Sequence, residues 1–236
     1  MKVVILAAGF GTRVSHLTGG RPKALMPYLG VTLLDALVQA LPENTAITLV
    51  SNAKYLDLFH EWARMTGRQL RILNNGITDP GERKGALFDL ALGLDAAGRD
   101  EPVVVFGSDS LFQFDLSLFF DAFHATASNL VGVRHNPDLT DQRRRGVVGL
   151  SANGKITRFE EKPDHPFSTI AATALYGFQP AALLQLNDYL AVSDDVDSPG
   201  HFVSHLVSKM DVRGWFLPGE LIDYGHASVL AKQLDQ

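Results

Sequence analysis

The sequence predicts an α/β fold in which a mixed, mostly parallel sheet is covered by helices on both faces. Short apolar runs rich in β-branched residues alternate with longer stretches whose apolar residues recur at helical spacing. Such continuous apolar runs are typical of parallel strands, because the connecting helices bury both faces of the sheet. An Asn153-Gly154 pair between two further strand-like segments adds an antiparallel hairpin to the second half.

The amino-acid composition of the chain argues against several classes of protein. The 236 residues, 46% of them hydrophobic, suffice for one sizeable core, so we expect a single domain over residues 1–236. The net charge of −5 argues against nucleic acid as a partner. The absence of cysteine excludes disulfides and thiolate catalysis. The apolar run at the N-terminus is too short for a signal or membrane segment, so we expect no membrane partner and a cytoplasmic location.

The first half of the chain reads as a series of β-α-β units. The predicted parallel strands are Lys2–Ala7, Ala46–Ser51, Leu70–Asn74 and Pro102–Gly107. Helical spacing of apolar residues predicts the crossover helices, near residues 33–41, 56–63 and 86–94.

The second half is predicted to be less regular. Residues 146–151 and 155–160 form the hairpin, and Asn153-Gly154 favours the two positive φ values of a type I′ turn. A strand near Ala171–Phe178, a helix after Pro180 and a last helix at 226–234 follow. The polar stretch Asn136–Arg145 ends in three consecutive arginines and is interpreted as a solvated loop, with a binding site as the alternative.

The loop after the first strand is a candidate phosphate cradle. Its residues are Leu6, Ala7, Ala8, Gly9, Phe10, Gly11, Thr12 and Arg13. Two glycines at the carboxyl edge of a parallel sheet can present backbone N–H groups to phosphate oxygens, and Arg13 can add a charged fork. A dinucleotide fingerprint needs a third glycine where this chain has Val14, and a P-loop needs a Gly-Lys-Ser/Thr run that is missing. A glycine turn required only for packing is the remaining alternative.

The continuation of this loop carries a family resemblance. Leu-Ala-Ala-Gly-x-Gly-Thr-Arg, followed by Pro22-Lys23-x-Leu25-x-Pro27, resembles the signature of sugar-phosphate nucleotidyltransferases, the family that includes glucose-1-phosphate thymidylyltransferases. Further blocks follow in the family's order: Phe106-Gly107-Ser108-Asp109, Gly146-Val147-Val148, Phe159-Glu160-Glu161-Lys162-Pro163 and Ile222-Asp223-Tyr224-Gly225. The resemblance implies a short, single-domain member with a Rossmann-like, glycosyltransferase A-like fold. Residues 1–110 would bind the nucleotide and residues 111–236 the sugar phosphate.

The resemblance also implies a reaction. A nucleotidyl group passes from a nucleoside triphosphate to a sugar 1-phosphate, giving a nucleotide sugar and pyrophosphate. Arg13, Lys23 and Asp109 would be catalytic, and Asp109 with Asp223 would hold Mg²⁺, which prefers carboxylate oxygens. Without the resemblance, Asp109 is better interpreted as a helix or turn cap and Asp223 as a turn residue.

Substrate contacts are assigned by the same resemblance. Gly146, Glu161, Lys162 and Tyr176 would bind the sugar phosphate, although Glu161-Lys162 also fits a surface ion pair. For the base, Asn75 and Gly85 are the candidates. This segment departs from the thymidylyltransferase pattern because it lacks the usual glutamine. The nucleotide therefore stays open, with dTTP or UTP favoured over GTP, ATP and CTP.

Two other functions fit the same residues. The acceptor could be a cyclitol phosphate or a phosphocholine-like molecule, since the phosphate chemistry is shared. A non-catalytic subunit that binds nucleotide sugars is the second alternative, although such relatives usually lose the Arg, Lys or carboxylate positions that this chain retains. The resemblance is compatible with a monomer or a homo-oligomer.

Overall fold

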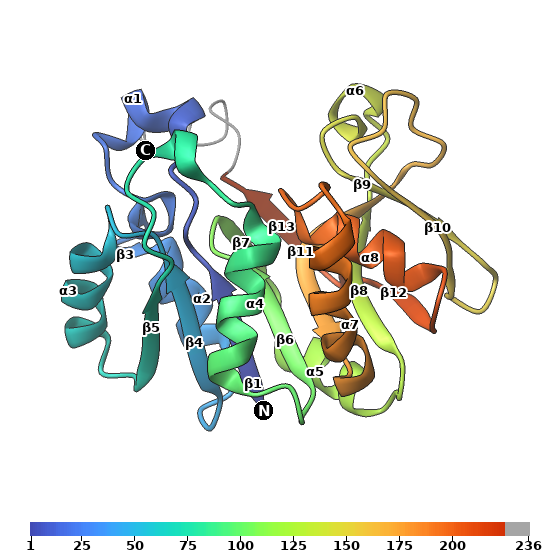
Figure 1. Ribbon diagram of the computed structural model, residues 1–236, viewed down its shortest axis with the longest axis horizontal. Coiled ribbons are helices and arrows are strands. Elements are labelled where there is room, and N and C mark those ends of the chain that lie inside the picture. The colour runs from blue at the N-terminus through green and yellow to red at the C-terminus, as the bar shows by residue number, and fades with distance from the viewer. Residues whose placement is uncertain (225–236) are drawn as a thin grey trace.

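The computed structural model describes residues 1–224, apart from the side chain of Arg13. A nine-stranded mixed sheet runs through both halves in the order β10-β9-β11-β6-β1-β4-β5, with β8 on β11 and β12 on β8 (Figure 1). The fold class expected from the sequence is confirmed. The helix predicted at 226–234 and Gly225 lie outside the described residues.

The parallel part of the sheet follows the sequence prediction closely. β1 (Lys2–Leu6) lies between β4 (Ala46–Ser51) and β6 (Val103–Gly107), and β5 (Leu70–Asn74) forms the edge. All these pairs are parallel. Their carboxyl ends therefore meet at one edge, where ligands bind in open α/β sheets. The crossover helices are α2 (Leu33–Ala40), α3 (Leu56–Thr66) and α4 (Ala86–Ala97).

Alternation along β1 divides the core into two layers. Val3 and Ile5 pack into one apolar cluster with residues of α2, α3 and α5 (Ser117–His124). Val4, between them, packs into a second cluster with residues of α4, α7 (Pro180–Val192) and α8 (Pro199–Val207). Successive side chains of a strand point to opposite faces, so this strand is apolar from Val3 to Leu6 and has a helical layer on each side.

The second half is mostly antiparallel. β11 (Ile170–Phe178) joins the halves, because it pairs antiparallel with β6, β8 and β9. The other strands are β8 (Asn129–His135), β9 (Gly146–Leu150), β10 (Ile156–Glu161) and β12 (Val212–Phe216).

The hairpin β9–β10 is present, but its predicted turn type is wrong. Gly154 has a positive φ of 80°, whereas Asn153 is not among the residues with positive φ. The Gly154 N–H donates to the Ser151 carbonyl, and the Asn153 side chain accepts a hydrogen bond from the Ser151 hydroxyl. The connection is longer than two residues, and a longer loop needs only one left-handed residue, which glycine supplies.

Short elements surround the carboxyl edge of the parallel strands. β7 (Ser110–Gln113) pairs antiparallel with β13 (Glu220–Asp223), which brings the end of the described chain back to this edge. The other short elements are η1 (Thr12–Val14), α1 (Ser15–Thr18), η2 (Lys23–Leu25), β2 (Pro27–Tyr28), β3 (Val31–Thr32), η3 (Pro80–Glu82) and α6 (Leu139–Gln142). Within residues 1–224, no helix combines the length and apolar character needed to cross a bilayer.

Candidate active site

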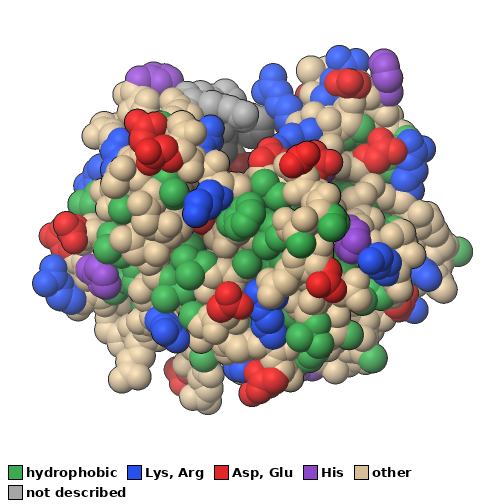
Figure 2. Space-filling model, in the orientation of Figure 1, with side chains coloured by type: hydrophobic (Ala, Val, Ile, Leu, Met, Phe, Trp, Pro, Cys, Tyr) green, Lys and Arg blue, Asp and Glu red, His purple; other side chains and the backbone are tan. Residues whose placement is uncertain are grey.

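A cavity of about 820 Å³ opens at the carboxyl edge of the parallel strands and is lined by both halves of the chain. From the first half it takes the predicted residues Gly9, Gly11, Thr12, Lys23 and Asp109. From the second half it takes Gly146, Glu161, Tyr176 and Asp223. Figure 2 shows charged side chains of both signs around the notch between the two upper lobes. Most residues expected at the site thus come together, although several lie about a hundred or more positions apart in the sequence.

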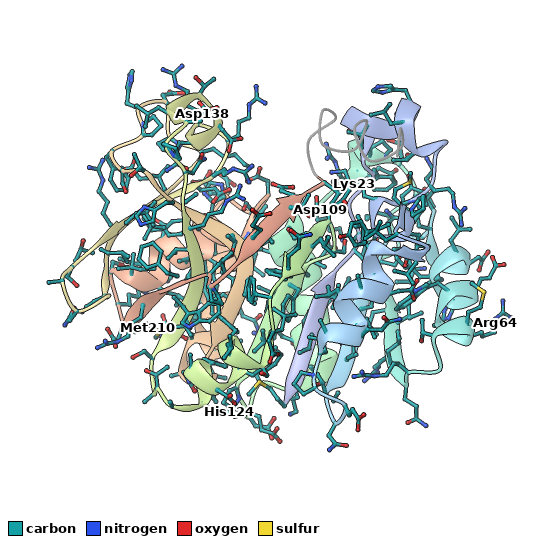
Figure 3. All side chains as sticks on the ribbon, turned by 180° about the vertical axis from the view of Figure 1, so that it is seen from behind. Lys23, Arg64, Asp109, His124, Asp138 and Met210 are labelled. Atoms are coloured by element: carbon teal, nitrogen blue, oxygen red, sulfur yellow. The ribbon has the colours of Figure 1, made fainter. Side chains whose placement is uncertain are left out.

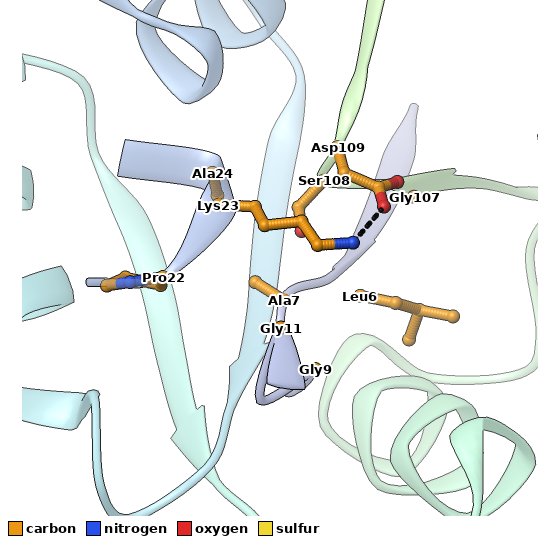
Figure 4. Close-up of a pocket in the computed structure, with 10 residues that line it drawn as sticks. All are labelled: Leu6, Ala7, Gly9, Gly11, Pro22, Lys23, Ala24, Gly107, Ser108 and Asp109. Atoms are coloured by element: carbon orange, nitrogen blue, oxygen red, sulfur yellow. Dashed lines mark hydrogen bonds and ion pairs between the residues drawn. The ribbon is translucent and has the colours of Figure 1, made fainter. Parts of the chain in front are cut away.

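The glycine loop leaves the end of β1 as the phosphate hypothesis requires. Gly11 has φ 60° and ψ 27°, a left-handed conformation that residues other than glycine rarely adopt. Among the described residues, none accepts a hydrogen bond from the backbone amides of Gly9 or Gly11. Leu6 and Ala7 line a smaller cavity of about 110 Å³ beside the same loop (Figure 4). Ala8 is buried, and its carbonyl accepts a hydrogen bond from the Asn52 side chain.

Two residues that the sequence analysis missed hold this loop. The Asn52 side chain is fully buried and donates a 2.9 Å hydrogen bond to the Ala8 carbonyl. It also accepts one from the Tyr55 N–H, and the Tyr55 hydroxyl donates to the Phe10 carbonyl at 3.1 Å. An asparagine directly after a predicted buried strand was the available signal, because that position faces the ligand edge.

Lys23 and Asp109 meet on the floor of the cavity. Their nearest polar atoms, Nζ and Oδ2, are 3.4 Å apart, and Figures 3 and 4 show the two side chains pointing toward one another at the strand ends. Burial raises the pKa of the Asp109 carboxyl, the Lys23 ammonium opposes that shift, and the charge of Asp223 adds to it. Asp109 follows β6, so it reaches the site because that strand ends there.

Asp223 arrives at the same place through strand pairing. In the β7–β13 ladder Asp223 lies opposite Ser110, and the N–H of Tyr224 donates a 2.9 Å hydrogen bond to the Asp109 carbonyl. The two carboxylates expected to bind a metal therefore lie beside each other, Asp109 just before β7 and Asp223 at the end of β13, close enough for their charges to repel. Among the described residues there is no group of three or more potential metal-binding side chains. A cation held here would need further ligands from substrate phosphate or water, as is usual for Mg²⁺.

The prediction of a solvated arginine loop is wrong for Arg145. Arg143 and Arg144 are exposed, but the Arg145 side chain is only 14% exposed and lies between two carboxylates. Its Nε is 2.6 Å from Asp141, and its Nη1 is 2.7 Å from Asp223. The sequence of this stretch does not distinguish Arg145 from Arg143 and Arg144. Arg145 differs because it contacts Asp223, which lies 78 residues later in the chain.

Glu161 forms the wall of the second half. Its side chain is 8% exposed, and one of its oxygens lies where the Cβ of a residue larger than Gly200 would have to be, 1.9 Å from the ideal position. Burial raises its pKa, while Ser198, Lys162 and His201 oppose that shift. Gly200 was not predicted; it is the second residue of α8, after Pro199, and leaves room for the carboxylate.

Two further sugar-site candidates, Tyr176 and Lys162, differ in position. Tyr176 is buried in the cavity wall, and burial together with the Glu161 charge raises the pKa of its hydroxyl. Lys162 has a positive φ of 50° and is not part of the wall. Its ammonium is 2.7 Å from Asp197, at the end of the segment before α8.

The two base-recognition candidates also lie off the cavity wall. Asn75 uses its side chain within the protein, donating to Asp89 at 2.8 Å and accepting from the Ile77 N–H. Gly85 is packed against the carbonyl of Val196, which an ideal Cβ would approach to 2.3 Å. Both residues therefore have structural roles in this conformation. Arg83, from the same segment, does line the cavity.

Known proteins are similar to this chain in sequence and in fold. UTP–glucose-1-phosphate uridylyltransferase from Synechocystis sp. is 27% identical over 99% of this chain. The solved structure of a UDP-glucose pyrophosphorylase complexed with UDP-glucose superimposes with a TM-score of 0.82 at 17% identity, covering 99% of this chain and 97% of that one. The inositol-1-phosphate CTP transferase of T. maritima gives 0.75 at 19% identity, with 98% and 95% covered.

These likenesses differ in what they cover. The two structures are too distant in sequence to show more than the fold, which they share over nearly their whole length. Our chain spans 64% of the length of the Synechocystis relative. The nucleotidyl transferase family matches residues 2–225, nearly the whole chain, and the protein belongs to that family.

Proposed function

We propose that this protein transfers a nucleotidyl group from a nucleoside triphosphate to a sugar 1-phosphate, releasing pyrophosphate. The observation that carries the proposal is that the glycine loop, the Lys23–Asp109 pair and the Glu161 wall all line the same cavity. It offers phosphate-binding groups on one side and ring-hydroxyl acceptors on the other. Since the donor is a nucleoside triphosphate, the proposed location is the cytoplasm.

Each side has a distinct task in the proposal. The amides of Gly9 and Gly11, which have no acceptor among the described residues, bind triphosphate oxygens, and Arg13 holds the leaving pyrophosphate. Lys23 stands between the two sides and reduces the repulsion between the α-phosphate and the incoming phosphate oxygen, which attacks phosphorus directly. Glu161 accepts hydrogen bonds from hydroxyl groups of the acceptor ring, and the Tyr176 hydroxyl donates or accepts one. Lys162 binds the phosphate of the acceptor after its ion pair with Asp197 breaks.

Asp109 and Asp223 fit a divalent cation as carboxylate ligands. Burial raises the pKa of the Asp109 carboxyl and the charge of Asp223 adds to this shift, and a bound dication would offset the repulsion between the two carboxylates. A bound Mg²⁺ supplies charge neutralisation and orientation of the reacting phosphate. Asp109 and Asp223 would hold it through their carboxylate oxygens.

A cyclitol 1-phosphate is the second candidate acceptor. The fold shared with an inositol-1-phosphate CTP transferase supports it, as does a wall that recognises hydroxyl groups through Glu161 rather than a ring oxygen. Small residues, Ala172 and Ala174, line the cavity next to this wall and leave room for either ring.

A pyrophosphate-release screen tests the proposal. Five nucleoside triphosphates are crossed with sugar 1-phosphates and inositol 1-phosphate in the presence of Mg²⁺. We expect release that requires both substrates, together with a product whose mass equals the nucleotide sugar or nucleotide cyclitol. Nucleotide binding without release on the whole grid would contradict transfer and favour a non-catalytic nucleotide-sugar binder.

A further inference from the structure

We propose that Arg145 is a positioning residue of the reaction centre, which fixes the carboxylate of Asp223 toward Asp109. This inference rests on the proposed metal site. It goes beyond it by assigning a role to a side chain outside every family block named above.

The geometry makes Arg145 a bridge. Its guanidinium contacts Asp141 through Nε at 2.6 Å and Nη2 at 3.3 Å, and Asp223 through Nη1 at 2.7 Å. All three side chains are mostly buried, with exposures of 14%, 24% and 20%. A planar fork can satisfy two carboxylates at once and holds them at fixed directions, which a lysine ammonium cannot do.

The backbone around Arg145 is fixed as well. Its carbonyl accepts a hydrogen bond from the Lys162 N–H, so the residue extends the β9–β10 pairing next to Glu161. Arg134, on β8, donates a 3.0 Å hydrogen bond to the Leu221 carbonyl and so ties β13 to the main sheet. The strand that carries Asp223 is thus held by Arg134, by Arg145 and by its pairing with β7.

The charges explain why Asp141 is needed. A lone guanidinium beside Asp223 would repel a divalent cation. Asp141 cancels that charge while anchoring the other side of the fork. A guanidinium remains protonated in proteins, so the bridge keeps its positive charge. Asp223 therefore keeps a fixed orientation without losing its attraction for the metal.

Two variants separate positioning from charge. Arg145→Lys keeps the positive charge but cannot span both carboxylates, whereas Asp141→Asn leaves the guanidinium without its compensating partner. We expect each to weaken binding of Mn²⁺ alone, measured by electron paramagnetic resonance, by about tenfold or more, the range typical for residues that orient metal ligands. The metal needed for half-maximal turnover should rise in parallel, with little change in the acceptor KM.

Arg143→Lys is the matched control, because Arg143 is exposed at the end of α6 and lies off the cavity wall. Mn²⁺ binding within twofold of the unsubstituted protein in both test variants would overturn the inference, even with transferase activity intact. A raised acceptor KM with unchanged Mn²⁺ affinity would also overturn it, by assigning Arg145 to the substrate. If the unsubstituted protein shows no Mn²⁺ binding that depends on Asp109, the metal site and this inference fail together, while the pyrophosphate-release screen still decides the transferase.

Discussion

The two walls of the cavity are built in different ways. In the first half, the proposed phosphate-binding elements come from one contiguous segment, residues 6–13, and rest on backbone geometry at the end of β1. In the second half, the wall combines side chains from β10, β11, the start of α8 and β13, which are joined only by folding. The first wall is consequently visible as a sequence motif, and the second depends on long-range ion pairs and close packing. The expected effects of substitutions follow this difference.

Asp109→Asn should have the largest effect, because it removes a charge at the point where the walls meet. We expect turnover to fall by about 10²–10³-fold, comparable to the loss of one strong electrostatic contact in a transition state. The fold should persist, since the volume hardly changes. Mg²⁺-dependent turnover and thermal unfolding are measured for this variant and for Asp121→Asn, an exposed aspartate on α5. Near-normal turnover of a folded Asp109→Asn protein would remove Asp109 from the reaction.

Gly200→Ala should damage the second wall. The new Cβ would lie 1.9 Å from a Glu161 oxygen, so the carboxylate or the start of α8 must move. We expect a loss of about 1–3 kcal/mol in stability, as for other overpacked sites. The acceptor KM should rise severalfold while the nucleotide KM stays near its original value. Equal changes in both constants would show that the walls do not act separately.

Asn52→Ala makes the complementary change beneath the first wall. It leaves the Ala8 carbonyl and the Tyr55 N–H without their buried partner, which should cost about 1–3 kcal/mol. Tyr55→Phe removes only the contact to the Phe10 carbonyl and should cost about 0.5–1.5 kcal/mol. Urea unfolding measures both losses. The nucleotide KM should rise more in Asn52→Ala than the acceptor KM, and the reverse order would refute the assignment of this loop to the nucleotide.

Glu161→Gln should have the smallest effect on stability, and the size of this effect depends on pH. Burial raises the pKa of Glu161 in the folded protein, so folding loses stability as pH rises from the unfolded pKa of about 4.3 through the folded value. The variant has no such loss. It should be more stable than the original protein near pH 7 and lose this advantage below about pH 4. Unfolding measured across this pH range tests the sign, and a variant that is less stable at pH 7 would contradict it.

The sequence could predict features that depend on local pattern. The parallel strands and their crossover helices follow from apolar periodicity, and the glycine loop follows from its spacing after β1. It could not show that Arg145 is buried while its neighbours are exposed, because this depends on Asp223 returning through the β7–β13 pair. The turn at Gly154 was assigned the wrong type because the type depends on the length of the loop. That length depends on where the two strands end, which sequence pattern defines only to within one or two residues.

Asn52 and Gly200 show the same limit at the site. Both are required by tertiary contacts, a buried carbonyl for Asn52 and a carboxylate oxygen for Gly200. The family resemblance predicts that Asn75 and Gly85 bind the base, but in the structure Asn75 forms hydrogen bonds within the protein and Gly85 packs against Val196, both away from the cavity. Their part in base recognition stays a prediction.

Binding of a nucleotide sugar and of its fragments tests the account most directly, because the product should occupy both walls at once. Calorimetric titrations compare the nucleotide sugar found in the screen with its nucleoside monophosphate and its sugar phosphate. We predict that the intact molecule binds more tightly than either fragment, and that Glu161→Gln removes the increment due to the sugar while leaving the affinity for the monophosphate unchanged. An intact molecule that binds no more tightly than the monophosphate would contradict a shared cavity with two substrate walls.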